Sequence, residues 1–353
     1  MIPVTTFQGQ KVALFGLGGS GLATARALKA GGADVVCFDD SEARVEAAAS
    51  EGFDTLDLRD LDWDQVSALV LAPGVPLTHP LPHWSVDLAR EAGIEIIGDV
   101  ELFCRERRKL CPDAPLIAIT GTNGKSTTTA MLGWIMQRTG HEPTIMNGAV
   151  IKNFVSPANP FASAVVGKSD VFVSEVDESD GSIALYNPTV AVLLNVSLDH
   201  KSMEELRQLF SDFLRRADTA VVNLDDDDAE FLARKCTKVI SFALDNKEAT
   251  LGIEPGTITE RVDGIDALLV DRRDDVGHSL RLPMPGRHNL ENALAAIARL
   301  MVSSMMASRL DRKRRSESGL FSGSKRHACI SRWRLKGIAS TAVTHPSCSD
   351  AAA

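Results

Sequence analysis

The fold is decided by the stretch Ile117-Ala118-Ile119-Thr120-Gly121-Thr122-Asn123-Gly124-Lys125-Ser126-Thr127-Thr128. A short apolar strand runs into a glycine-rich turn, and the turn leads into Lys-Ser-Thr and a helix. Backbone N–H groups of such a turn point at phosphate oxygens, and the helix adds the positive end of its dipole. The stretch therefore predicts a site for a nucleoside triphosphate, made by Gly121, Thr122, Asn123, Gly124, Lys125, Ser126 and Thr127.

Lys125 and the two hydroxyl residues after it have different predicted roles. Lys125 would reach the β- and γ-phosphates, and the hydroxyl of Ser126 or Thr127 would ligate Mg²⁺. The usual G-x-x-x-x-G-K-[ST] spacing is matched incompletely, because Ile119 stands in place of the first glycine. An ordinary glycine-rich turn between a strand and a helix is the alternative.

Acidic and imidazole side chains follow two further apolar strands. The strand Val171–Glu175 delivers Glu175, Asp177 and Glu178 to its carboxyl end, where the second Mg²⁺ contact of a P-loop fold is found, and Glu175 is preferred as the first acid after the strand. The strand Val190–Asn195 is followed by Asp199 and His200; His200 would ligate the metal, and Asp199 would orient His200 or bind the metal through water. The alternatives are that the acids face solvent and that His200 is a structural histidine.

The first hundred residues carry a second nucleotide-binding pattern. Residues 11–97 alternate short apolar strands with helical stretches, which predicts a mostly parallel, doubly wound sheet. Gly16-x-Gly18-x-x-Gly21 lies between the first strand and its helix, Asp39 closes the second strand, and Gly74 follows a later one. This pattern predicts a small nucleotide-binding domain without naming the ligand. Glycines needed only for tight helix–strand packing are the alternative.

The segment Pro285–Asn292 opens the last recognisable helix after a glycine turn. Asn289 and Asn292 lie three residues apart on one face of that helix, which suits amide contacts with the edge of a base. A helix N-cap is an equally good interpretation of Asn289.

Composition and charge argue against several functional classes. The chain has 353 residues and a net charge of −9, and this acidic balance argues against nucleic-acid binding as the main task. No run approaches the roughly 18 apolar residues needed to span a membrane, and Met1–Lys11 lacks the regions of an export signal. The six cysteines show no C-x-x-C pair or metal-ligand spacing, which indicates free thiols in a reducing cytoplasm.

The pattern changes near residue 301. Residues 301–353 carry ten Lys and Arg against three Asp and Glu, and their apolar periodicity fades. This composition predicts a disordered tail without a core of its own. The expected fold is α/β: a Rossmann-like domain over residues 1–108, a P-loop-type α/β ATP-binding domain over 109–300, and an irregular basic tail over 301–353.

Taken together, these blocks resemble the Mur ligases, the ATP-dependent amino-acid ligases of peptidoglycan precursor synthesis. The resemblance spans residues 8–300, and four blocks carry it in order: Gly121–Thr127, Glu175, Asn195–His200 and Gly286–Asn292. Three segments of the first domain look like the family member that adds D-glutamate: Gly16–Gly21, Ala72–Pro76 and Gly98–Phe103. Three central segments look more like the member that adds L-alanine: Pro143–Gly148, Ser174–Asp180 and Asn195–His200. The chain shows no counterpart of the lysine that is carbamylated in the D-glutamate member; Arg215 and Arg216 lie in that neighbourhood, which also favours an alanine-type centre.

The resemblance implies three groups of site residues. The UDP-sugar end would be bound by Gly18, Gly19, Ser20, Asp39, Gly74 and Asn147. The catalytic residues would be Lys125, Glu175 and His200, with Mg²⁺ held by Ser126, Thr127, Glu175 and His200. The remaining part of the ATP site would be formed by His288, Asn289 and Asn292.

The resemblance also implies the reaction. A substrate carboxylate attacks the γ-phosphate of ATP to give an acyl phosphate, and the amino group of the incoming amino acid displaces phosphate. Addition of D-glutamate to UDP-N-acetylmuramoyl-L-alanine, by a cytoplasmic monomer, is the preferred interpretation. The alternatives are L-alanine addition to UDP-N-acetylmuramate, an inactive nucleotide-binding remnant, and a nicotinamide dehydrogenase built on the first glycine pattern.

The family implies a third domain, which positions the amino acid and completes the ATP site. No Asp-Ser-x-Lys-Ala-Thr-Asn block follows residue 300, and the basic tail does not resemble one. A reading-frame shift near residue 300 would explain this change, and resequencing the gene at codon 300 would test it.

Overall fold

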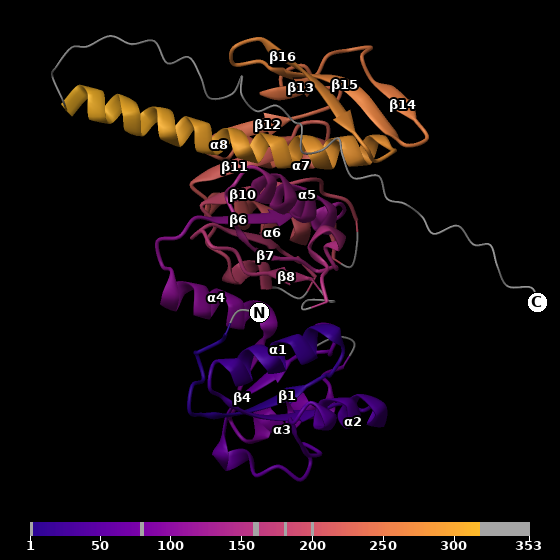
Figure 1. Cartoon of the computed structure of the whole chain (residues 1–353), viewed down its shortest axis with the longest axis vertical. Coiled ribbons are helices and arrows are strands. Elements are labelled where there is room, and N and C mark those ends of the chain that lie inside the picture. Colours follow the sequence, from indigo (N-terminus) through magenta and orange to yellow (C-terminus); the bar gives the residue numbers. More distant parts are fainter. Residues whose placement is uncertain (1–2, 78–80, 158–161, 180–181, 199–200, 318–353) are drawn as a thin grey trace, which may run out of the picture. The chain divides into compact units, whose positions relative to one another are not determined.

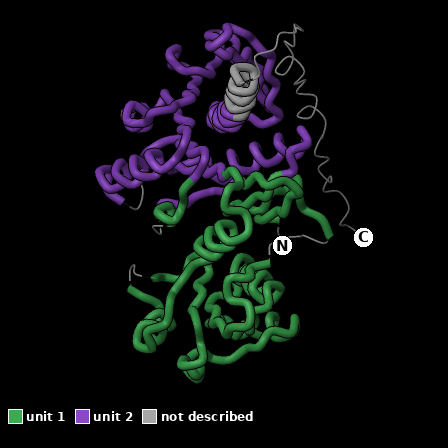
Figure 2. The backbone as a smooth tube through the Cα atoms, turned by 90° about the vertical axis from the view of Figure 1, so that its left-hand side faces the viewer, with its two compact units in different colours: residues 1–115, 143–172, 179–187 green, residues 116–142, 173–178, 188–353 purple. Residues whose placement is uncertain are grey.

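The computed structural model describes residues 3–317, apart from 78–80, 158–161, 180–181 and 199–200. The chain divides into two compact units (Figure 2). Unit 1 consists of residues 1–115, 143–172 and 179–187, and unit 2 of residues 116–142, 173–178 and 188–353. The first change of unit lies close to the predicted boundary at residue 108, whereas two segments predicted in the central domain group with unit 1.

Unit 1 contains a five-stranded parallel sheet in the order β3-β2-β1-β4-β5. This is the strand order with which a Rossmann sheet begins, so the predicted architecture is confirmed. The strands are β1 (Lys11–Phe15), β2 (Asp34–Phe38), β3 (Asp54–Thr55), β4 (Val66–Leu71) and β5 (Glu95–Gly98). The helices are α1 (Gly19–Ala30), α2 (Glu42–Ser50), α3 (Trp84–Glu91) and α4 (Asp99–Leu110), with a 3₁₀ turn at Trp63–Gln65. The later segments of this unit form β7 (Thr144–Met146), β8 (Ala164–Val165) and 3₁₀ turns at Lys152–Phe154 and Ser182–Leu185.

The apolar run of β1 explains why helices cover both faces of the sheet. Successive strand side chains point to opposite faces. Val12 and Leu14 accordingly pack in one buried cluster with residues of α1, α2 and α4, and Ala13 and Phe15 pack in another with residues of α3. A strand that is apolar on both faces is typical of a parallel sheet between two helical layers.

Unit 2 is built on a second sheet, whose strands within this unit run in the order β14-β15-β13-β12-β11-β10-β6-β9, with β16 beside β15. The strands are β6 (Leu116–Thr120), β9 (Phe172–Glu175), β10 (Val190–Leu193), β11 (Thr219–Asn223), β12 (Val239–Phe242), β13 (Leu251–Ile253), β14 (Thr259–Arg261), β15 (Gly264–Asp271) and β16 (Val276–Leu282). The helices are α5 (Lys125–Arg138), α6 (Met203–Arg215), α7 (Asp227–Ala233) and α8 (Arg287–Glu317). The pairs from β6 through β10 and β11 to β12 are parallel, and the strands around β15 are antiparallel.

The sheet topology of unit 2 brings three predicted segments to one edge. β6 lies between β10 and β9, and Thr120 at its end is in register with Leu193 of β10. On the other side, the amide of Val176, just after β9, donates to the carbonyl of Ile119. The glycine-rich loop, the acids after β9 and the segment after β10 therefore emerge side by side.

Helix α8 packs against α5 and against β11 and β12 within unit 2 (Figure 1). It begins at Arg287 and its backbone remains helical to Glu317, so the helix extends past the predicted boundary at residue 300. Residues 318–353 of the predicted tail lie outside the described residues. None of the helices that the structure describes is long and apolar enough to cross a lipid bilayer.

Candidate active site

The glycine-rich loop ends where α5 begins. Gly124 is the N-cap of α5 and has a φ of 88°, and its carbonyl accepts the amide of Thr128. The first N–H groups of a helix have no acceptor within the helix. The amides of Lys125, Ser126 and Thr127 are therefore available to phosphate oxygens at the positive end of the α5 dipole.

The other half of the loop is held by Asn195, which follows β10. The Asn195 side chain accepts the amide of Asn123 at 2.8 Å and donates to the carbonyl of Asn123 at 3.1 Å. Its own carbonyl accepts the amide of Thr122 at 3.2 Å. Two of the loop amides thus face the segment after β10, which corrects the expectation that the amides of the whole turn point at phosphate. Asn195 forms a clamp on the loop, a role that the sequence did not assign.

The segment after β10 is fixed in turn by neighbours on both sides. The amide and the carbonyl of Ser197 both bond to the Thr122 hydroxyl, at 2.9 and 3.1 Å. The amide of Val196 donates to Asp226 at 3.0 Å, and the other oxygen of Asp226 caps α7 through the amide of Ala229. The predicted ligand His200, with Asp199, comes directly after this segment and lies outside the described residues.

Lys125 does not stand free in the loop. Its ammonium group contacts Glu178 at 2.9 and 3.2 Å and the carbonyls of Gly121 and Thr122 at 2.8 and 3.3 Å. The Glu178 side chain is only 5% exposed and that of Lys125 is 14% exposed. Burial raises the pKa of Glu178, and the neighbouring Lys125 opposes that rise. The sequence placed Glu178 at this edge but gave it no role.

Ser126 and Glu175 form the oxygen pair that suits a magnesium ion. The Ser126 hydroxyl donates to a carboxylate oxygen of Glu175 at 2.9 Å. A hydroxyl and a carboxylate beside a phosphate loop are the usual protein ligands of Mg²⁺. Ser126, rather than Thr127, is the hydroxyl residue in contact with Glu175. Within the described part of the chain no group of three or more His, Cys, Asp or Glu is arranged to hold a metal.

The predicted residues at the start of α8 divide into two groups. Asn292 is buried, and its side-chain oxygen accepts the hydroxyl of Thr128 in α5 at 3.2 Å. Asn292 thus stabilises the helix that follows the loop. The side-chain amide of Asn289 donates to the carbonyl of Pro285 at 2.7 Å, which stabilises the start of the helix. A base contact by His288 and Asn289 stays a prediction.

In unit 1, Asp39 closes the turn between β1 and α1. Its carboxylate accepts the amide of Leu17 at 2.6 Å and that of Ser41 at 2.8 Å, and Arg44 lies 3.3 Å away. Burial alone would raise the pKa of Asp39, but these donors outweigh burial and lower it. A methyl group at Gly21 would lie 1.8 Å from the carbonyl oxygen of Gly16, so close helix–strand packing explains that glycine.

Four of the six predicted UDP-sugar residues lie on two loops at the carboxyl edge of the unit 1 sheet, because β1 and β4 are parallel neighbours. Gly18, Gly19 and Ser20 begin α1 after β1, and Gly74 follows β4. Asn147 lies elsewhere in the unit, after β7. Its amide nitrogen donates to the carbonyl of Ala149 at 2.9 Å, and its buried oxygen has no hydrogen-bond partner among the described residues. That oxygen could accept one further donor.

Asp39→Asn is expected to lower the free energy of unfolding of unit 1 by about 1–2 kcal/mol at pH 7, because an amide accepts the two backbone N–H groups less well. The folded-state pKa of Asp39 is depressed, so its contribution is present above the unfolded pKa of about 4 and is lost as the pH falls through the folded pKa. Urea unfolding should therefore show a gap between variant and parent at pH 7 that narrows below about pH 4. Asp34→Asn, at an exposed carboxylate 3.7 Å from Lys11, is the control and should change stability little.

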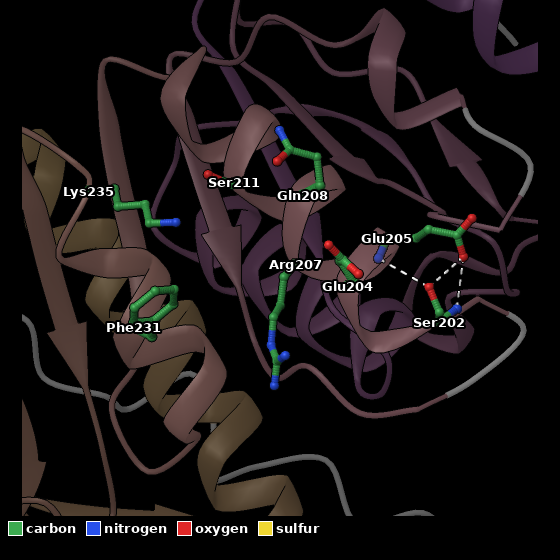
Figure 3. Close-up of a pocket in the computed structure, with 8 residues that line it drawn as sticks. All are labelled: Ser202, Glu204, Glu205, Arg207, Gln208, Ser211, Phe231 and Lys235. Atoms are coloured by element: carbon green, nitrogen blue, oxygen red, sulfur yellow. Dashed lines mark hydrogen bonds between the residues drawn. The ribbon is translucent and has the colours of Figure 1, made fainter.

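A shallow groove of about 580 Å³ lies on the surface of α6 and α7 (Figure 3). Its lining comprises Ser202, Glu204, Glu205, Arg207, Gln208, Ser211, Phe231 and Lys235. Ser202 and Glu205 form a capping box at the start of α6, and Arg207 pairs with Asp228 of α7 at 2.6 Å. The groove contains none of the predicted site residues, and three of its polar side chains, those of Ser202, Glu205 and Arg207, serve a helix end and the pairing of α6 with α7.

Comparison with known proteins agrees with the geometry of the loop. A model of the Mur ligase middle domain matches residues 119–300. The UDP-N-acetylmuramoylalanine--D-glutamate ligase of Agrobacterium fabrum is 47% identical over 308 residues, which cover 84% of this chain and 63% of that protein. The ligase of the same name from Rhizobium meliloti is 46% identical over 307 residues, which cover 84% and 64%. The chain thus spans less than two thirds of the length of these relatives.

Solved structures show the same fold. The UDP-N-acetylmuramate-alanine ligase of Thermotoga maritima superposes with a TM-score of 0.65 at 22% identity, over 83% of this chain and 65% of that one. A UDP-N-acetylmuramate:L-alanyl-gamma-D-glutamyl-meso-diaminopimelate ligase of Neisseria gives a TM-score of 0.64 at 23% identity, over 82% and 92%. The domain match covers more than half of the residues, and a relative that is 47% identical matches 84% of the chain. The chain therefore belongs to the Mur ligase family.

Proposed function

We propose that this chain carries the nucleotide and UDP-sugar sites of a ligase that adds D-glutamate to UDP-N-acetylmuramoyl-L-alanine at the expense of ATP. One observation supports this most: Lys125 and the Ser126–Glu175 pair lie together at the end of β6. The resemblance to D-glutamate ligases supports the choice of substrate. ATP and Mg²⁺ are the proposed nucleotide and metal, and we place the reaction in the cytoplasm with the protein as a monomer.

The residues of the loop fit a triphosphate with its metal. The free amides of Lys125, Ser126 and Thr127 would bind phosphate oxygens, and the Lys125 ammonium would neutralise charge on the γ-phosphate. Ser126 and Glu175 would hold Mg²⁺, with His200 as a further ligand. When bound, the metal would supply charge neutralisation between the phosphates and the attacking carboxylate.

Two bond exchanges make up the proposed reaction. The carboxylate oxygen of the UDP-muramoyl substrate bonds to the γ-phosphorus, and the bond to the β-phosphate oxygen breaks to release ADP. The amino nitrogen of D-glutamate then attacks the acyl carbon, loses a proton, and phosphate leaves. Phosphoryl transfer of this kind depends on positioning and charge neutralisation more than on covalent help from the protein.

The UDP end of the substrate would lie against the two loops of unit 1. Gly18, Gly19 and Ser20 present backbone amides at the start of α1, which suits a diphosphate. Gly74 would bring the second loop close, and Asp39 would act by fixing the turn that shapes the first. Asn147 would offer its buried oxygen to a substrate donor.

The test measures ADP release by the purified chain in the presence of Mg·ATP. D-glutamate with UDP-N-acetylmuramoyl-L-alanine is expected to stimulate release, and L-alanine with UDP-N-acetylmuramate is not. Stimulation by the second pair alone would move the assignment to L-alanine addition. Binding of Mg·ATP without turnover by either pair would identify a nucleotide-binding remnant, and no binding at all would refute the proposal.

A further inference from the structure

Glu178 is the most buried charged group beside the loop, and the only charged side chain in hydrogen-bond contact with Lys125 among the described residues. It lies three residues beyond Glu175, on the turn after β9. The two acids have separate partners, because Glu175 contacts Ser126 and both oxygens of Glu178 contact Lys125. The edge of the sheet thus carries one acid for the metal pair and another for the lysine.

The contacts of Lys125 account for all the protons of its ammonium group. Such a group has three donors, and two loop carbonyls and the Glu178 carboxylate surround it. A phosphate oxygen can therefore bind Lys125 only by replacing one of these partners. The carbonyl of Thr122 belongs to a loop that Asn195 and Ser197 hold in place, whereas Glu178 carries a negative charge that repels phosphate. Glu178 is the partner to be displaced.

Displacement has an electrostatic consequence. The Glu178 side chain is 5% exposed, and a buried carboxylate is stabilised by its counter-ion. Once a phosphate draws the ammonium away, Glu178 keeps its charge with less compensation and faces a second anion. The affinity for a triphosphate is therefore lower than the loop amides and Lys125 would give by themselves.

We propose that Glu178 is an internal counter-ion, a positioning residue that holds Lys125 in the nucleotide-free loop and competes with the terminal phosphates for it. This inference rests on the proposed function of the loop as an ATP site. It assigns Glu178 a role opposite to that of Glu175, which supports nucleotide binding through the metal.

The test compares dissociation constants for Mg·ATP and for AMP in the parent chain and Glu178→Gln, by equilibrium dialysis. Glutamine keeps the shape and an acceptor for Lys125 but removes the charge. Mg·ATP is expected to bind at least about tenfold more tightly to Glu178→Gln, because one like charge near the phosphates is lost from partly buried surroundings. AMP lacks the phosphates that compete for Lys125, so its affinity should change less than about twofold. A merely structural role would affect both ligands alike.

Three further variants make the result decisive. Asp177→Asn removes a charge from the exposed neighbouring position and should leave Mg·ATP affinity within about twofold. Glu175→Gln should weaken Mg·ATP binding. Glu178→Ala, which removes both the charge and the contact with Lys125, is the substitute if Glu178→Gln does not fold, and it should also bind Mg·ATP more tightly than the parent.

Equal or weaker Mg·ATP binding by folded Glu178→Gln would overturn the counter-ion role and leave the proposed function intact. Tighter binding of AMP to the same degree would overturn it too, since the gain would not be tied to the terminal phosphates. Failure of the unaltered chain to bind Mg·ATP would overturn both proposals.

Discussion

Lys125→Ala is expected to weaken Mg·ATP binding at least about a hundredfold, and to abolish ADP release. The ammonium is the cationic side chain that the described loop presents, and without it the charge of the γ-phosphate is uncompensated. The loop amides would still bind phosphate oxygens, so AMP and other weakly charged ligands should be affected less. Isothermal titration with Mg·ATP and an assay for released ADP measure both effects.

The same substitution should also destabilise unit 2, and this effect needs its own control. Glu178 would stay buried without its counter-ion, a situation that costs about 3–5 kcal/mol. Lys125→Ala/Glu178→Gln should recover the stability but not the nucleotide binding, which separates the two effects. Lys235→Ala removes an exposed lysine that lies over the Phe231 ring in the same unit and should change neither. Unchanged turnover in Lys125→Ala would refute the assignment of the loop.

Much of the fold could be predicted because its signals are local. The apolar runs of β1 and β6 identify buried parallel strands, and the glycine turns after them identify helix starts. Residues 143–172 and 179–187 were predicted in the central domain but group with unit 1. Their described residues form only short strands and 3₁₀ turns, so the sequence shows no alternation of strands and helices that would indicate where they pack.

The residue types of the candidate site could be predicted from the sequence, but which of these residues contact each other could not. Gly124, Lys125 and Glu175 follow from motif spacing at strand ends. The clamp by Asn195 depends on the register of β10 beside β6, which the sequence alone does not give. The sequence gives Glu178 no role, because the first acid after a strand is the usual metal ligand. The turn after β9 decides which acid reaches Lys125.

Asn292 shows that a residue in a predicted site can have a structural contact that the sequence does not report. Its place on the second turn of α8 predicts a contact with a base, since its amide lies on the same helix face as Asn289, and that contact stays a prediction. In the structure α8 packs against α5. The side-chain oxygen of Asn292 accepts the hydroxyl of Thr128 and lies next to Gly124. A base contact would require a lone pair or a donor that faces away from α5. Packing between helices distant in sequence decides this orientation, and no local pattern reports it.

Gly124→Ala is expected to reduce Mg·ATP affinity about a hundredfold by reshaping the loop from which Lys125 projects. Gly124 has a φ of 88°, and a methyl group there would lie 2.3 Å from the Asn292 side-chain oxygen and 3.3 Å from Leu194. The strained backbone costs about 1–2 kcal/mol, and the overlap with the buried Asn292 side chain requires that side chain or the loop to shift. A shift of the loop moves the free amides of Lys125, Ser126 and Thr127 away from a bound phosphate.

Gly140→Ala is the control that separates the effect of backbone strain from the effect of a changed loop shape. Gly140 lies just beyond the other end of α5, away from the loop. It has a φ of 84°, and a methyl group there would have no neighbour within 4 Å. Gly140→Ala should therefore lose about the same 1–2 kcal/mol of stability in urea unfolding while it binds Mg·ATP like the parent. Equal loss of affinity in both variants would mean that binding follows global stability, and would contradict a loop whose shape is set by the contact between Gly124 and Asn292. Recovery of affinity in Gly124→Ala/Asn292→Gly, where the overlapping oxygen is removed, would locate the effect in that contact.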